Sequence, residues 1–341
     1  MRVARYYRND DVRLEQAPVP EIGPGEVLVR IEASGICGSD VVEWYRIKHA
    51  PIVLGHEVAG VVEQVGEGVE RFRPADRVMA THHVPCNACR YCRSGHHQVC
   101  DTLRSTHYDP GGFAEYVRLP AINVNRGTFL LPDHVSFEEG AFLEPLACVV
   151  RGQRKTGLRA GQSVLVSGSG MSGLLHIALA RAAGADPIVS TDVHPYRLEA
   201  ARRLGADAAI DAREDVPARF RELNGGRGAD QVIICTAAQA AVEQAFRTVE
   251  RGGTVLMFAL PDPDTVYAVP LSDLWKDDVS LVHSYAGAPA DIREALDLIA
   301  TGRVDVAPMI THRMGLAETG DAFRLVLAAG ESLKIIIEPQ R

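Results

Sequence analysis

Residues 164–183, VLVSGSGMSGLLHIALARAA, decide the fold of this chain. Four residues typical of a buried strand lead into a glycine-rich turn, and an apolar run long enough for a helix follows. Gly168, Gly170 and Gly173 have the spacing G-x-G-x-x-G. The first glycine of this pattern permits a tight turn, the second lets the backbone approach a pyrophosphate, and the third lets helix and strand pack closely. The stretch therefore predicts a strand–turn–helix unit that binds the phosphates of a dinucleotide at the helix N-terminus.

An acidic residue supports this prediction. Asp192 ends the next predicted strand, 24 residues after Gly168. A carboxylate there accepts hydrogen bonds from the adenosine ribose hydroxyls and repels a 2′-phosphate, which favours NAD over NADP. In the alternative interpretation the turn is a mere connector and Asp192 caps the following helix. Arg197 lies close behind Asp192 and is placed to meet a phosphate. We interpret the glycines, Asp192 and Arg197 as an NAD site.

Strands alternate with helices around this unit, as in a doubly wound parallel sheet. The predicted strands cover 163–167, 188–191, 208–210, 231–235 and 254–259, and helices run from the turn to 183 and over 196–204 and 240–249. Before this region, from 27 to about 124, short β-type runs separated by Gly and Pro predict a mostly antiparallel, barrel-like domain. The tail has a predicted helix at 292–299 and a final strand at 333–338. One interpretation is that this tail rejoins the first domain.

Composition and charge exclude several classes of function. The 341 residues exceed the usual size of one hydrophobic core, so two domains are expected. The net charge of −8 argues against a surface that neutralises phosphates, so we expect no nucleic-acid partner. Residues 1–16 lack the apolar core of a secretory signal, and the most apolar stretch, 164–185, is broken by polar residues, so no membrane span is expected. We expect a cytoplasmic protein whose seven cysteines are thiols or metal ligands.

Four of the cysteines lie within fifteen residues. They have the spacing C-x2-C-x2-C-x7-C and are Cys86, Cys89, Cys92 and Cys100. Thiolates at such separations can converge on one Zn²⁺ with no position left for substrate. The alternatives are an iron–sulfur cluster and four unrelated buried thiols. Nothing else in the chain indicates electron transfer, so we predict a structural zinc that holds a loop in place.

A second set of metal-binding residue types is spread more widely. Cys37 lies in SGICGSD, His56 and Glu57 lie in LGHEVAG, and Glu144 lies in FLEPLACV. A thiolate, an imidazole and carboxylates suit a zinc ion with an open or water-filled position. Each residue also has an ordinary explanation: a core thiol, a buried imidazole, half of an ion pair, or a charge near a helix N-terminus. The spacing alone leaves the two interpretations equally supported.

The order of the motifs adds a resemblance that covers essentially the whole chain. GICGSD, GHEVAG, the four-cysteine run, EPL and G-x-G-x-x-G follow one another as in the zinc-containing medium-chain dehydrogenase/reductase superfamily, and the chain most resembles its branch of sorbitol, threonine and related polyol dehydrogenases. The resemblance implies an α/β protein with a GroES-like β-barrel catalytic domain and an inserted Rossmann domain with a doubly wound parallel sheet. The catalytic domain would comprise 1–145 and 285–341, with the structural zinc lobe at 83–103, and the Rossmann domain 146–284.

The resemblance also implies roles for single residues. Cys37 and His56 would bind a catalytic zinc directly, and Glu57 and Glu144 would bind it directly, through water, or in exchange with water. Ser39 resembles the family hydroxyl that takes the alcohol proton, although a turn hydrogen bond is its simpler role. Bound Zn²⁺ would lower the pKa of a substrate hydroxyl so that hydride passes to the nicotinamide of NAD.

One position departs from the family pattern. Many relatives carry a proton-relaying histidine five residues after the zinc cysteine, where this chain has Val42. The proton would leave through water, Glu57, Glu43 or His49. The other histidines, including His82 and His83, are interpreted as surface or lobe residues.

We expect a zinc-dependent oxidoreductase that transfers hydride between a secondary alcohol, a polyol or something similarly polar, and NAD. Trp44, Tyr45, Arg46 and Lys48 lie where relatives shape the substrate cleft. The alternatives are an L-threonine or other amino-alcohol dehydrogenase and a zinc-free quinone or enone reductase of the same superfamily. By analogy with relatives, a homodimer or homotetramer is expected.

Overall fold

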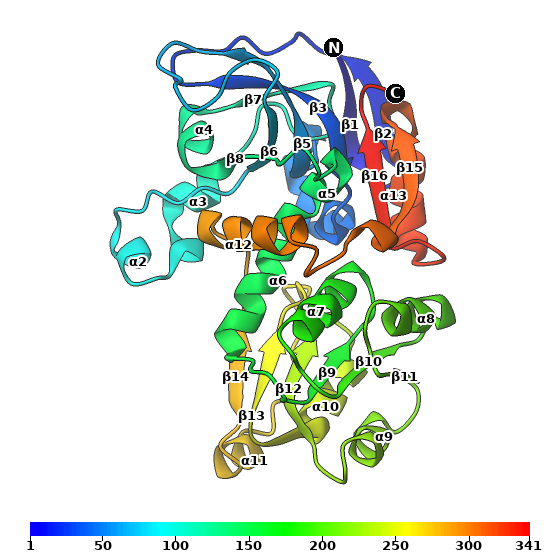
Figure 1. Ribbon diagram of the computed structural model, residues 1–341. Helices are drawn as coiled ribbons and strands as arrows, with labels where there is room; N and C mark the ends of the chain where they lie inside the picture. The colour runs from blue at the N-terminus through cyan, green and yellow to red at the C-terminus, as the bar shows by residue number, and fades with distance from the viewer. The chain divides into compact units, whose positions relative to one another are not determined.

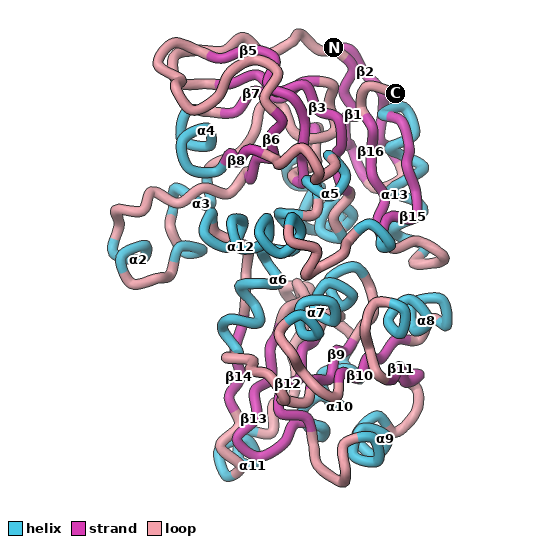
Figure 2. Tube along the Cα trace, in the orientation of Figure 1, coloured by secondary structure: helices cyan, strands magenta, loops and turns pink.

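The computed structural model describes residues 1–341, which divide into two compact units. Met1–Ala147 and Ala286–Arg341 form the first unit, and Cys148–Tyr285 form the second. Figure 1 shows the sheets and helices of each unit, and Figure 2 separates helices, strands and loops by colour. None of the helices combines the length and the apolar character that crossing a membrane requires.

The second unit contains a six-stranded parallel sheet with the order β11-β10-β9-β12-β13-β14. Its strands are β9 (Val164–Ser167), β10 (Ile188–Asp192), β11 (Ala208–Asp211), β12 (Ala229–Ile234), β13 (Val249–Met257) and β14 (Ser280–His283). Every residue of β9 and β10 is buried, as expected for central strands covered on both faces. The predicted doubly wound parallel sheet is confirmed.

The helices of this unit follow the alternation that the sequence predicts. They are α7 (Met171–Ala182), α8 (Pro195–Arg203), α9 (Val216–Leu223), α10 (Gln239–Thr248) and α11 (Leu271–Lys276), and α6 (Leu143–Thr156) leads into the unit. α7 contacts α8, and α9 contacts α10. The strand order reverses between β9 and β12, so the glycine turn after β9 lies at the switch point where dinucleotides bind in such sheets.

The first unit is built on a seven-stranded sheet with the order β15-β16-β3-β5-β6-β8, and β7 pairs with β3. Its strands are β3 (Val27–Gly35), β5 (Glu57–Val65), β6 (Arg77–Thr81), β7 (Tyr116–Leu119), β8 (Thr128–Leu130), β15 (Ile310–Gly315) and β16 (Lys334–Glu338). All pairs are antiparallel except β15 with β16. β16 joins β3 where Ile336 faces Gly35, so the C-terminal segment extends a sheet that begins near the N-terminus.

A smaller sheet and several short helices complete this unit. The small sheet has the order β2-β1-β4, with β1 (Arg2–Arg8), β2 (Asp11–Gln16) and β4 (Ile52–Val53), and sequence analysis did not predict it. The helices are α1 (Glu43–Arg46), α2 (Arg90–Arg93), α3 (Asp101–Ser105), α4 (Ala121–Gly127), α5 (Phe137–Ala141), α12 (Pro289–Ala300) and α13 (Thr319–Ala328). The chain ends lie near each other in Figure 1, and Arg2 Nη1 donates to the carbonyl of Arg341.

Candidate active site and metal centres

Cys37, His56 and Glu57 converge at one end of the pair β3 and β5. The antiparallel register sets Gly35 opposite Glu57, so Cys37, two residues after Gly35, lies close to His56 and Glu57. One ligand atom from each of the three residues lies within 4.8 Å of the others. A thiolate, an imidazole and a carboxylate are donors that zinc accepts, and three protein ligands leave a fourth position for substrate. This donor set fits a catalytic zinc.

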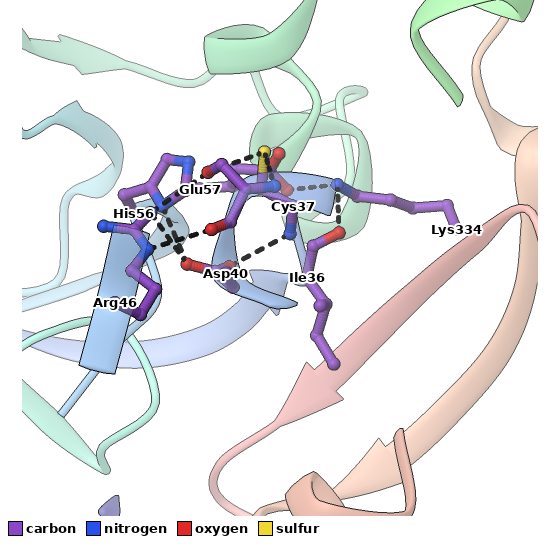
Figure 3. A network of polar contacts seen from close by, with 8 residues as sticks. Ile36, Cys37, Asp40, Arg46, His56, Glu57 and Lys334 are labelled. Atoms are coloured by element: carbon purple, nitrogen blue, oxygen red, sulfur yellow. Dashed lines mark hydrogen bonds and ion pairs between the residues drawn. The ribbon is translucent and has the colours of Figure 1, made fainter. Parts of the chain in front are cut away.

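Asp40 orients this group, and sequence analysis missed it. Its side chain is fully buried. One carboxylate oxygen accepts a hydrogen bond from the Cys37 amide at 3.1 Å, and the other lies 3.3 Å from His56 Nδ1 (Figure 3). With Nδ1 directed at Asp40, the imidazole presents Nε2 to a metal. The sequence feature that could have indicated Asp40 is the acid three residues after Cys37 in GICGSD.

The same pair shifts two pKa values. Burial lowers the pKa of His56, but the Asp40 carboxylate outweighs burial and holds this pKa well above its usual value. Burial raises the pKa of Asp40, yet His56 and Arg46 hold it below its usual value. A metal binds the neutral imidazole, so a metal bound here would displace the proton that Asp40 stabilises on His56.

Ser39 and Arg46 form the polar edge of the site. Ser39 Oγ lies 3.3 Å from Cys37 Sγ. Arg46 Nη2 donates to Ser39 Oγ at 3.0 Å, and Nε donates to the Ser39 carbonyl at 2.9 Å. The guanidinium also lies 4.7 Å from the ring centre of Tyr45. A cation therefore contacts the hydroxyl for which the family resemblance predicts a role in proton transfer.

A second histidine packs against His56. The ring of His82 lies 4.8 Å from that of His56 and 3.7 Å from that of His83. The interpretation of His82 as a surface or lobe residue was wrong, because strand β6 ends at Thr81 beside β5 and carries His82 to the metal ligands. Burial, with the charges of neighbouring histidines, lowers the pKa of His82 well below its usual value, so this ring is neutral at pH 7.

Glu144 lies in the first turn of α6 and is 7% exposed. It is not part of the three-residue group within 4.8 Å. Burial raises the pKa of Tyr108 well above its usual value, and the nearby charge of Glu144 raises it further. The Tyr108 ring lies 6.0 Å from that of His82. A direct bond from Glu144 to the metal stays a prediction.

The four cysteines of the lobe also converge. Their Sγ atoms all lie within 4.8 Å of one another, with Cys89 and Cys92 at 3.5 Å and Cys86 and Cys100 at 3.6 Å. Burial raises the pKa of Cys100, but backbone and thiol hydrogen bonds outweigh burial and lower it to about 6. Figure 2 shows that this lobe consists of loops and short helices. Four thiolates around one point fit a tetrahedral zinc that holds together a segment with little secondary structure of its own.

The glycine turn has the geometry that its spacing predicts. Gly168 has φ +96°, a left-handed conformation that favours glycine. A Cβ on Gly173 would overlap the carbonyl of Gly168, so only glycine lets α7 start this close to β9. Asp192 Oδ2 accepts a hydrogen bond from the Ser169 amide within the turn at 2.9 Å. His194 occupies the N-cap position of α8 without a side-chain cap hydrogen bond, and its amide donates to Asp192 Oδ1 at 2.9 Å.

Comparisons with known proteins agree with this geometry. The family model "Alcohol dehydrogenase GroES-like domain" matches residues 23–132, and "Zinc-binding dehydrogenase" matches residues 173–301. The sorbitol dehydrogenase of Bacillus subtilis (strain 168) is 32% identical over 352 residues, which cover 100% of this chain and 98% of that protein. The chain belongs to the zinc-binding alcohol dehydrogenases.

Solved structures of other zinc-binding alcohol dehydrogenases have the same fold. Alcohol dehydrogenase TADH from Thermus sp. ATN1 is 31% identical with a TM-score of 0.88, and 99% of each chain is covered. A zinc-binding dehydrogenase from Sinorhizobium meliloti 1021, bound to NADP, is 30% identical with a TM-score of 0.89 and the same coverage. The predicted family and the GroES-like plus Rossmann fold are confirmed. This zinc-binding dehydrogenase is therefore an oxidoreductase with a zinc and a nicotinamide cofactor.

Proposed function

We propose that this enzyme transfers hydride between a secondary alcohol, a polyol or a similarly polar compound, and NAD. The convergence of Cys37, His56 and Glu57 beside Ser39 carries the proposal, because it supplies a metal site and a proton-transfer group together. The full-length similarity to a sorbitol dehydrogenase supports a polyol as the substrate.

Cys37 and His56 would hold the catalytic zinc, with Glu57 and Glu144 as direct, water-mediated or exchanging partners. When bound, zinc supplies a Lewis acid that makes a substrate hydroxyl more acidic. Ser39 would accept the proton of that hydroxyl while passing its own proton on to water, Glu57, Glu43 or His49. Arg46 donates a hydrogen bond to Ser39 Oγ and so fixes the position of this hydroxyl. Val42 has no group that carries a proton onward.

The four cysteines of the lobe would hold the structural zinc, and the glycine turn, Asp192 and Arg197 would hold the cofactor. Asp192 supports NAD because its carboxylate, fixed to the turn through Ser169, would repel a 2′-phosphate. Arg197 Nη1 lies 4.0 Å from Asp192 Oδ2 and would attract a phosphate. NADP in the Sinorhizobium meliloti relative makes the choice of cofactor a necessary measurement.

The second unit supports assembly into a homodimer or homotetramer. β14 is an edge strand of the parallel sheet, with backbone groups open to pairing. In the segment that leads to it, Val266 is 86% exposed and Trp275 is 85% exposed. Apolar side chains beside an open strand suit a symmetric contact with a second copy. We propose a cytoplasmic location, where the seven cysteines would serve as thiols or metal ligands.

An activity panel tests the proposed function. NAD and NADP reduction is measured with sorbitol, xylitol, inositols, L-threonine, butanediol and simple secondary alcohols, alongside the zinc content of the enzyme. We expect the highest kcat/KM with a polyol and NAD, and two zinc ions per subunit. A preference for L-threonine would make the enzyme an amino-alcohol dehydrogenase. Full activity in a preparation without zinc would contradict the metal mechanism.

A further inference from the structure

A buried lysine contacts the candidate metal site from the far end of the chain. Lys334, the first residue of β16, pairs through Nζ with Glu57 Oε2 (Figure 3). Each side chain is 1% exposed. Nζ also donates to the Ile36 carbonyl at 3.1 Å, next to Cys37. Burying two charges is costly unless both are well partnered, so the pair needs a reason other than general stability.

The fold is built to hold this pair. The Ile36 amide donates to the Ile335 carbonyl at 3.1 Å, which places Lys334 where β3 ends and the Cys37 turn begins. A Cβ on Gly35 would overlap Glu57 Oε2 and the Cε atom of Lys334. Any larger residue at this position would require the ends of the two side chains to shift. Gly35 thus has a specific structural role beside the metal ligands.

The pair bears directly on how Glu57 can bind a cation. A carboxylate oxygen of Glu57 belongs to the group within 4.8 Å that fits zinc. Lys334 Nζ donates to Oε2, so part of the negative charge of this carboxylate is already compensated. An ammonium bonded to a carboxylate weakens the attraction between that carboxylate and a metal ion, because the two cations compete for the same negative charge.

We propose that Lys334 is a positioning residue that keeps Glu57 a weak, exchangeable ligand of the catalytic zinc. The inference rests on the proposed function and adds a residue that adjusts how strongly Glu57 binds the zinc. With Lys334 in place, Glu57 yields its position when substrate arrives. Without Lys334, the full charge of Glu57 is available to the metal, which is then held more tightly and in a less open coordination.

The test is Lys334→Met, which keeps the length of the side chain and removes its charge. Two properties are measured besides turnover: the rate at which excess chelator removes the catalytic zinc, and the visible absorption of the cobalt-substituted enzyme. We expect about tenfold slower zinc loss: changes to groups that contact metal ligands have effects of this size, and here the direction is set by removal of the competing ammonium. The cobalt bands should weaken as the coordination number rises. kcat should fall, and the KM for NAD should stay the same.

Controls separate the metal effect from a structural one. Glu338→Gln removes a charge from the other end of β16 and should leave zinc loss and the cobalt bands unchanged. Lys334→Met should have no further effect in a Glu57→Gln background, because Lys334 acts through Glu57. This comparison is confined to zinc loss and the cobalt bands, because Glu57→Gln alone leaves the Lys334 charge buried without its partner. It also serves if Lys334→Met alone does not fold, because the double variant buries neither charge.

Each outcome decides between the two proposals. A folded Lys334→Met variant with wild-type zinc loss and cobalt bands overturns the role of Lys334, while zinc-dependent wild-type turnover keeps the proposed function. A difference between the double variant and Glu57→Gln overturns it as well. A wild-type enzyme that turns over without zinc at Cys37 and His56 overturns both.

Discussion

Replacing His176 with leucine is expected to make the second unit less sensitive to acid. His176 lies in α7, is fully buried, and packs edge-on against Phe258 at 4.5 Å between ring centres. Its Nδ1 accepts a hydrogen bond from Gln153 Nε2 at 3.2 Å, while Nε2 is buried without a partner. Burial lowers the pKa of His176 to about 3, so the ring stays neutral in the folded protein.

The size of the effect follows from the difference in pKa between the folded and unfolded chains. The unfolded imidazole, with its ordinary pKa of 6.5, takes up a proton at pH 5, and the folded one does not. Because the folded pKa is depressed, the stabilisation is complete above 6.5 and is lost as the pH falls toward 3. Between pH 7 and pH 5 the loss is about 2 kcal/mol. Leucine removes this loss and keeps an apolar side chain of similar volume.

Urea unfolding of wild type and His176→Leu at pH 7 and pH 5, followed by circular dichroism, measures the effect. The quantity of interest is the loss of unfolding free energy between the two pH values, compared between the proteins. The wild type should lose about 2 kcal/mol more than the variant. Equal losses would show that His176 binds a proton in the folded protein, which would refute the reasoning from burial.

Three further predictions concern the proposed sites. Cys37→Ser or His56→Ala should reduce turnover by at least about 10³-fold, since either change removes a ligand of the Lewis acid. The affinity for NAD, measured by calorimetry, should not change, and a near-wild-type kcat would contradict the metal mechanism. Asp192→Ala should raise kcat/KM with NADP relative to NAD by about tenfold or more, and unchanged discrimination would mean that another residue reads the ribose. Cys92→Ser should halve the bound zinc and lower the melting temperature; two zinc ions per subunit in that variant would exclude a zinc held by the four cysteines.

Local pattern was sufficient for much of the fold. The strand, turn and helix around Gly168 were predictable because an apolar run, a glycine spacing and a helical run are adjacent in the sequence. The start of β13 was predicted less well. The strand begins at Val249, which faces Ala229, and a register shift separates this start from the predicted one at 254. The small sheet of β1, β2 and β4 was missed because β2 is largely exposed and β4 has two residues, so neither has a marked period.

The residues of the candidate metal site also differ in whether the sequence predicts them. Cys37, His56 and Glu57 lie in short motifs at the adjacent ends of two strands that pair with each other, and the family resemblance is sufficient to predict that they lie together. The sequence does not indicate the roles of Asp40 and Lys334, because an acid after a turn and a lysine at the start of a strand are usually ordinary surface residues. Only the register of β16 on β3 shows that Lys334 lies beside Glu57. Residues that bind a metal can be predicted from local motifs, whereas those that tune its ligands depend on contacts between distant segments. The groups that adjust the strength of the zinc site are therefore better sought in the C-terminal strand than in the motifs that define the family.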